Sequence, residues 1–308
     1  MIELSSFLIP TESILWFINE YSLIALVLMI GLLVFMQKAL FSQDGVSRVS
    51  VFIPSLLVTA LISMVLVLVL QIVAMFVFEA VYAAMTESRS GAGAARAIGA
   101  ASSGRVGFIA MIVLGITFLI GGGYAVVYME SSIFMNFAGS IIGVGFLEEA
   151  MKLLAATIIF FCFYRKLGLR YSLAPFAIAG LGFGAGEALH YFGAYAMYGS
   201  DLRMYILRAL WCVSLHAAWT LISGSLVVQM FGRIPNLTDL SGEDYCRVLL
   251  CLAPSAILHG IYNGFCWAGS GFFVTVGIIS LIWGLGVLFS PKEEFAPRGC
   301  PEDRVDQM

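Results

Sequence analysis

The chain has 308 residues, of which 61% are hydrophobic and only 11% are charged, against about 25% charged in an ordinary soluble domain. This composition excludes an ordinary soluble domain and indicates a polytopic membrane protein, while a net charge of −3 does not suggest a nucleic-acid-binding protein. The six cysteines show no C-x-x-C spacing and predict neither a zinc ribbon nor a disulfide framework.

Apolar runs long enough for a membrane-spanning helix, which needs roughly 20 residues, occur along the whole chain. The eight runs lie at residues 14–37, 52–84, 106–128, 133–164, 172–198, 204–231, 246–268 and 272–290. Asn19 and Glu20 interrupt the first of them. The sequence therefore predicts an all-α fold, a polytopic transmembrane helix bundle with about eight spanning helices.

The linkers between these runs predict the orientation in the membrane, because cytoplasmic loops carry an excess of Lys and Arg. With eight helices, eleven basic residues fall on one side and four on the other, the four being Lys38, Arg48, Arg203 and Arg208. This bias predicts that both termini are cytoplasmic, although the first helix alone favours the reverse. The longest linker, Thr86–Arg105, is rich in Ala, Gly and Ser and fits a flexible loop or a short interfacial helix.

Polar side chains at helical spacing interrupt the apolar runs in the middle of the chain. The clusters are Glu148-Glu149-x-x-Lys152, then Phe183-x-x-x-Glu187, then His216 followed by His259-x-x-x-Asn263. An ionised side chain at the bilayer centre costs roughly 2.5–3.5 kcal/mol, so several of them facing lipid would be strongly unfavourable. We therefore expect the clusters, which come from four consecutive helices, to converge on a site inside the bundle.

The first cluster places one basic residue within reach of two acids. Lys152 lies four residues after Glu148 and three after Glu149, so its ammonium can contact either carboxylate on a helix. We expect one glutamate to pair with Lys152 and the other to face a cavity as a general base. A structural ion pair that only stabilises the bundle is the alternative.

The second cluster follows a glycine-rich stretch. Small residues at Gly180–Gly186 predict a close helix–helix approach immediately before Glu187. His190 lies three residues after Glu187, the spacing of one half of a di-iron site, but such sites need two of these motifs and the chain has one. We interpret His190 as an interfacial or core hydrogen-bonding residue near several aromatic side chains.

The remaining two histidines lie deep in apolar runs, so both ring nitrogens of each need partners. Thr220 follows His216 by four residues, and Asn263 follows His259 by four, where an amide can fix a tautomer or bind an oxyanion. Each histidine alone is as consistent with a structural role as with a functional one. A serine nucleophile beside His216 is a rival hypothesis, but the G-x-S-x-G and H-E-x-x-H signatures are absent.

In this order, the clusters resemble the PrsW-type intramembrane endopeptidases, within the CAAX-processing and bacteriocin-processing membrane protease superfamily. The family pattern is E-E-x-x-K, then F-x-x-x-E, then a histidine, then H-x-x-x-(D/N), and the chain matches it over about residues 133–270. Glu187 stands where the CAAX-processing branch has histidine, which is typical of the PrsW branch. The resemblance implies N-terminal helices and a linker at 1–130, a catalytic bundle at 131–270 and a last helix with a charged tail at 271–308.

The resemblance implies an integral membrane endopeptidase that hydrolyses membrane-anchored proteins or peptides in the lipid bilayer, such as an anti-sigma factor or a lipidated or leader-bearing peptide, with no nucleic-acid partner. The catalytic residues would be Glu148, Glu149, His216 and His259, supported by Lys152, Phe183, Glu187 and Asn263. Water activation by a glutamate without cofactor is the preferred mechanism. The alternative is a Zn²⁺ site with His216, His259, Glu149 and Glu187 as possible ligands.

Two other classes of function remain open at this stage. The superfamily resemblance extends to the Aph subunit of γ-secretase, so a non-catalytic scaffold is the second hypothesis. A proton- or ion-coupled transporter is the third, because it also needs buried ionisable groups and broken helices. Gly121–Gly123 and Gly180–Gly186 are the candidate breaks, although no internal repeat supports a transporter.

Overall fold

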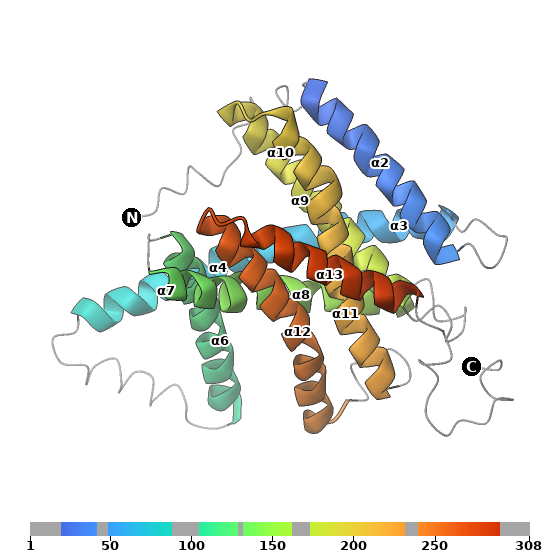
Figure 1. The fold of residues 1–308 in the computed structure, drawn as a ribbon. Helices are drawn as coiled ribbons and strands as arrows, with labels where there is room; N and C mark the ends of the chain where they lie inside the picture. Colours follow the sequence, from blue (N-terminus) through green and yellow to red (C-terminus); the bar gives the residue numbers. More distant parts are fainter. Residues whose placement is uncertain are drawn as a thin grey trace, which may run out of the picture. The chain divides into compact units, whose positions relative to one another are not determined.

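The structure, a computed structural model, describes residues 20–41, 49–87, 105–128, 132–161, 173–231 and 240–289. Within these ranges the chain is helical and contains no strand, so the predicted all-α class is confirmed (Figure 1). Most of the linker at Thr86–Arg105 and the tail from Pro291 lie outside the described residues.

Eight continuous helices make up the described part of the chain, and they correspond to the eight apolar runs. Their segments are α2 (Glu20–Phe41), α3 (Val49–Val58), η3 (Thr59–Ser63), α4 (Met64–Glu87), α6 (Arg105–Tyr128), α7 (Ile133–Gly139), η4 (Ser140–Gly145), α8 (Phe146–Ile159), α9 (Ala174–Tyr198), α10 (Leu202–Ile206), η7 (Leu207–Cys212), α11 (Val213–Phe231), α12 (Gly242–Trp267) and α13 (Phe272–Phe289). The segments marked η are π-helical turns inside longer helices. Such turns occur frequently at functional sites, and η4 and η7 directly precede the helices that carry Glu148 and His216.

Five helices of the described chain are long and apolar enough to cross a membrane. Their spans are Tyr21–Lys38, Phe52–Ala83, Leu202–Phe231, Gly242–Trp267 and Phe272–Phe289. In Phe52–Ala83 only 19% of the span is buried, whereas in Leu202–Phe231 the share is 83%. The span that contains His216 is therefore largely covered by the rest of the protein.

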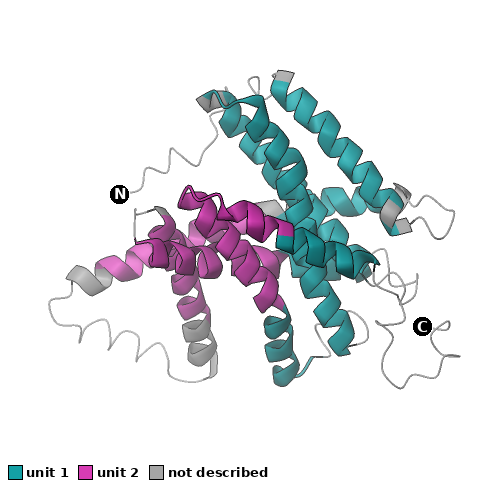
Figure 2. Cartoon of the chain, viewed as in Figure 1, with its two compact units in different colours: residues 1–64, 152–251, 279–308 teal, residues 65–151, 252–278 magenta. Residues whose placement is uncertain are grey.

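The chain divides into two compact units, each made of separate segments (Figure 2). Unit 1 contains residues 1–64, 152–251 and 279–308, and unit 2 contains residues 65–151 and 252–278. The divisions at 151/152 and 251/252 fall inside α8 and α12. The predicted organisation into 1–130, 131–270 and 271–308 stays a prediction.

In unit 1, α9 packs along α11, and glycines make the approach close. A Cβ added at Gly180 would lie 2.4 Å from the carbonyl oxygen of His216, and one at Gly184 would lie 2.8 Å from the Cα of Val213. The predicted close helix packing at Gly180–Gly186 is confirmed. α9 is also continuous through these glycines, so they serve packing and do not break the helix.

In unit 2, α6 packs against α7 and η4, again through glycines. A Cβ added at Gly123 would lie 2.8 Å from the backbone nitrogen of Gly143. Gln71 on α4 donates a hydrogen bond to the hydroxyl of Tyr124 on α6. Like α9, α6 is a continuous helix through its glycines. The two glycine stretches that the sequence offered as helix breaks for a transporter are therefore helical in the described chain.

Candidate functional site

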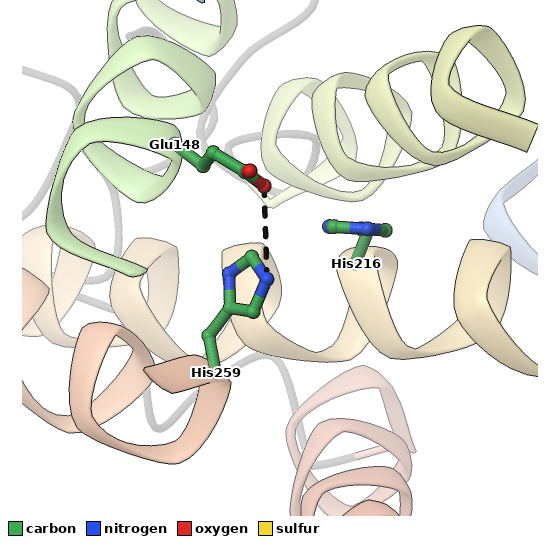
Figure 3. A group of neighbouring side chains, drawn as sticks. All are labelled: Glu148, His216 and His259. Atoms are coloured by element: carbon green, nitrogen blue, oxygen red, sulfur yellow. Dashed lines mark ion pairs between the residues drawn. The ribbon is translucent and has the colours of Figure 1, made fainter. Parts of the chain in front are cut away.

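Unit 2 places His259 of α12 beside two adjacent glutamates of α8. His259 Nδ1 lies 3.0 Å from Glu149 Oε1, and His259 Nε2 lies 3.6 Å from Glu148 Oε2, the ion pair drawn as a dashed line in Figure 3. Because the two glutamates are consecutive, they point about 100° apart on the helix, and one ring nitrogen faces each of them. All three side chains are buried.

The tautomer of His259 depends on the charge of these groups, and Nε2 pairs ionically with Glu148 only when the imidazole is protonated. With Glu149 ionised and His259 neutral, the shorter contact favours Nδ1–H donating to Glu149, because a carboxylate only accepts hydrogen bonds. The lone pair is then on Nε2, on the side of Glu148. Metal-binding histidines usually donate one ring N–H to a carboxylate, as His259 would to Glu149 in this tautomer.

Close backbone packing brings α12 to this position in unit 2. A Cβ added at Gly145, the last residue of η4, would lie 2.3 Å from the carbonyl oxygen of Ala256. A Cβ added at Gly260, next to His259, would lie 2.4 Å from the Cα of Ile141. Side chains larger than hydrogen at these positions would push α12 away from the helix that carries Glu149.

Unit 1 contains a second carboxylate–histidine contact with the opposite ring nitrogen. Nε2–H of His216 on α11 donates to Glu187 Oε2 on α9 at 2.8 Å. His216 Nδ1 lies 2.7 Å from Lys152 Nζ, and an ammonium group has donors only, so Nδ1 accepts. Both contacts therefore select the same neutral tautomer of His216, with the proton on Nε2.

Aromatic rings surround the buried ammonium of Lys152. Its Nζ lies 4.6 Å from the ring centroid of Phe183 and 5.8 Å from that of Trp219, and the side chain is fully buried. A desolvated cation over an aromatic face gains roughly 2 kcal/mol. This contact gives Phe183, which the family pattern contains without explaining, a physical role in unit 1.

The structure also describes other polar residues near the histidines and glutamates of the predicted site. Thr220 donates its hydroxyl to the carbonyl oxygen of His216, and Ser225 donates to that of Ile222, so each contacts its own helix. His190 is partly buried, and its ring packs edge-on against Tyr191 with 5.7 Å between centroids. Asn263 lies one turn after His259 on α12 and is partly buried.

Sequence reasoning missed Arg208, which was counted as a loop residue. The structure places it within the span Leu202–Phe231, on the π-helical turn η7, where its guanidinium contacts Glu187 at 3.2 Å. A basic residue four positions inside an apolar run was the available signal. The predicted orientation does not depend on Arg208. Leaving Arg208 out of the count lowers the smaller group of basic residues and so increases the difference between the two sides.

A family model described as PrsW family intramembrane metalloprotease matches residues 100–288, well over half of the chain. The match begins earlier and ends later than the motifs, and it includes all of α6 and most of α13. No curated protein and no solved structure matches the chain.

Proposed function

The chain belongs to the PrsW family of intramembrane metalloproteases, and on this premise we propose that it cleaves membrane-anchored proteins or peptides, with Glu148, Glu149, His216 and His259 as its catalytic residues. Two buried carboxylate–histidine contacts, one in each unit, carry this proposal. Buried histidines with their tautomers fixed by carboxylates are costly to maintain in an apolar helix bundle, and an enzyme needs them for chemistry.

The residues present fit a catalytic zinc ion. Two histidines and one carboxylate form the donor set of many catalytic zinc sites, and Glu148, His216 and His259 can each offer one ligand atom. Glu149 and Glu187 suit the outer positions better, because each already accepts an N–H from a histidine. A bound zinc ion would polarise the scissile carbonyl and acidify water.

The other polar residues would orient the reacting groups. Glu149 and Glu187 would fix the rings of the two histidines. Lys152, which contacts His216 Nδ1, would have to give up this contact for His216 to hold a metal. Asn263, one turn from His259, would donate its amide N–H to the oxyanion that develops on the scissile carbonyl. In the metal-independent alternative, Glu148 or Glu149 would take the proton from water. The metalloprotease family favours the metal-dependent alternative.

Two rival functions make different predictions. A non-catalytic scaffold would tolerate Glu149→Gln, whereas an enzyme would lose activity with it. A transporter would need broken helices near the midplane, and the continuity of α6 and α9 speaks against this. We propose the protease first, the scaffold second and the transporter third.

The membrane environment and orientation complete the proposal. Eight spanning helices would place both termini on one side, and the excess of basic residues makes that side cytoplasmic. The substrate would reach the site from the bilayer, as a membrane-anchored protein such as an anti-sigma factor or as a lipidated or leader-bearing peptide.

The test combines metal analysis with a cleavage assay. Full-length protein would be purified in detergent without chelator, beside a His216→Ala/His259→Ala double variant. His190→Ala is the matched control, because it removes the third histidine of the chain. We expect about one zinc per chain in wild type and control and none in the double variant. Only the zinc-containing proteins should cleave tagged membrane-anchored proteins in proteoliposomes.

Two results would contradict parts of the proposal. Zinc retained by the double variant would place the metal elsewhere. Cleavage by well-folded wild type that holds no zinc would favour the glutamate-dependent mechanism.

A further inference from the structure

Arg208 is a cation inside a membrane-spanning helix that the family motifs do not include. It lies on η7, eight residues before His216, and its side chain is 23% exposed. We propose that Arg208 is a positioning residue that fixes the tautomer of His216 through Glu187, with the ring proton on Nε2 and Nδ1 as the nitrogen that would hold a zinc ion. This inference rests on the proposed function for its purpose, but its geometry lies within unit 1.

The guanidinium of Arg208 makes three contacts with one face of α9. Glu187, Tyr191 and Tyr195 follow each other at intervals of four residues and therefore share a helix face. Arg208 forms an ion pair with Glu187 at 3.2 Å, and its guanidinium lies 3.7 Å from the ring centroid of Tyr191. Its Nε–H also donates to the hydroxyl of Tyr195 at 3.3 Å. A planar group with several donors and a stacking face suits these contacts, and a lysine does not.

The ion pair and the histidine contact use the same carboxylate oxygen. Glu187 Oε2 lies 3.2 Å from Arg208 Nη1 and 2.8 Å from His216 Nε2. Arginine is always charged in proteins, so it favours the ionised carboxylate, which only accepts hydrogen bonds. It also restrains the carboxylate from rotating away from the imidazole.

The consequence for His216 is a defined ligand atom. With the proton on Nε2, the lone pair is on Nδ1, where Lys152 Nζ lies at 2.7 Å. If Arg208 only stabilised the packing of η7 against α9, its loss would change stability without changing the tautomer. The two roles are therefore separable by a measurement on the histidine ring.

Histidine-selective ¹⁵N labelling makes this measurement practical, because the chain has only three histidines. Spectra of the full-length protein in detergent would be assigned with His190→Ala and His216→Ala. We expect the ring proton of His216 on Nε2 in wild type and in Lys152→Met, which removes the other contact that selects this tautomer. In Arg208→Gln combined with Lys152→Met we expect a proton divided between both nitrogens. Arg203→Gln is the matched control, since Arg203 is an arginine of the preceding helix α10 that is 80% exposed.

Zinc affinity supplies the second readout. Chelator competition should show about 10–100-fold weaker zinc binding in Arg208→Gln, the usual effect of losing support behind a metal-binding histidine. Arg208→Lys keeps the charge and should restore part of the loss. Combining Arg208→Gln with Glu187→Gln should add little to the single change, because both act on the same contact.

The outcomes separate this inference from the proposed function. If the His216 tautomer in the folded Arg208→Gln/Lys152→Met double variant equals that in Lys152→Met, and Arg208→Gln leaves zinc affinity unchanged, the positioning role is overturned. If Arg208→Gln does not fold, Tyr195→Phe removes one contact to the guanidinium, and an unaltered spectrum and zinc affinity there would also overturn it. If no protein binds zinc or cleaves substrate, the proposed function fails, while the tautomer measurement still decides the role of Arg208.

Discussion

In unit 1, His216 donates from Nε2 to Glu187, whereas in unit 2 His259 donates from Nδ1 to Glu149. Both histidines are buried, and each has its tautomer fixed by one carboxylate. They differ in the group that faces the lone pair. That group is the ammonium of Lys152 for His216 and the carboxylate of Glu148 for His259.

This difference means that the two histidines would not be equivalent ligands if zinc binds as proposed. A cation between His259 Nε2 and Glu148 would neutralise the carboxylate and use the ring nitrogen at once. His216 Nδ1 accepts from Lys152, so it would hold a metal only if Lys152 gave up that hydrogen bond. On the proposed function, the buried ammonium of Lys152 is therefore the group that would have to move.

Single Glu→Gln substitutions should give the largest effects. They compare a glutamate that would bind zinc with the glutamates that would only support a histidine. Structural zinc binding by four ligands is worth about 10–16 kcal/mol, or about 2.5–4 kcal/mol for each ligand, so Glu148→Gln should weaken zinc binding by about 10²–10³-fold. Glu149→Gln and Glu187→Gln leave a group that still accepts from the imidazole, and each should cost only about 10–100-fold. Chelator competition measures all three. Equal losses for Glu148→Gln and Glu149→Gln would abolish the distinction between ligand and supporting carboxylate.

Adding one methyl group beside each histidine should break the two contacts separately. Gly184→Ala would place Cβ 2.8 Å from Val213 Cα and 3.1 Å from His216 Cδ2, and Gly145→Ala would place it 2.3 Å from the carbonyl oxygen of Ala256. Overpacking against backbone costs about 1–3 kcal/mol or more, so both variants should unfold at lower temperature in detergent.

Gly115→Ala is the control for these two variants, because nothing lies within 4 Å of its added Cβ. Its thermal unfolding should equal that of wild type or lie slightly higher. In ¹⁵N spectra, Gly184→Ala should shift the signals of His216, and Gly145→Ala those of His259. A shift of both histidines in both variants would mean that the two contacts are not independent.

The sequence predicted the helices and the polar clusters well because both depend on local spacing. Apolar runs of sufficient length become helices, and residues four apart share a face whatever the tertiary packing. The partners of the histidine rings were not accessible in this way. Glu149 and His259 are 110 residues apart, and only packing through Gly145 and Gly260 brings them together.

The missed features have physical reasons of the same kind. Thr220 was a candidate partner at i+4 from His216, but a threonine hydroxyl reaches the carbonyl of the preceding turn, and it binds there. The π-helical turns η4 and η7 have no clear sequence signature. Arg208 looked like a loop cation because its neutralising partner, Glu187, is on another helix.

The smallest predicted effect concerns an aromatic contact of His216. Its neighbour Trp219 lies edge-on to the imidazole at 5.3 Å between centroids and donates its indole N–H to Ser280 of α13 at 2.9 Å. Trp219→Phe keeps a ring beside His216 but removes the donor, so it should lower the free energy of unfolding by about 1 kcal/mol. Ser280→Ala should cost a similar amount, and the double variant should cost less than the sum of the two, because both remove the same hydrogen bond.

Zinc affinity should change by less than about threefold in all three variants, since the carboxylate contact of His216 is retained. Additive stability losses, or a large loss of zinc binding, would mean that α13 supports His216 through contacts other than this hydrogen bond.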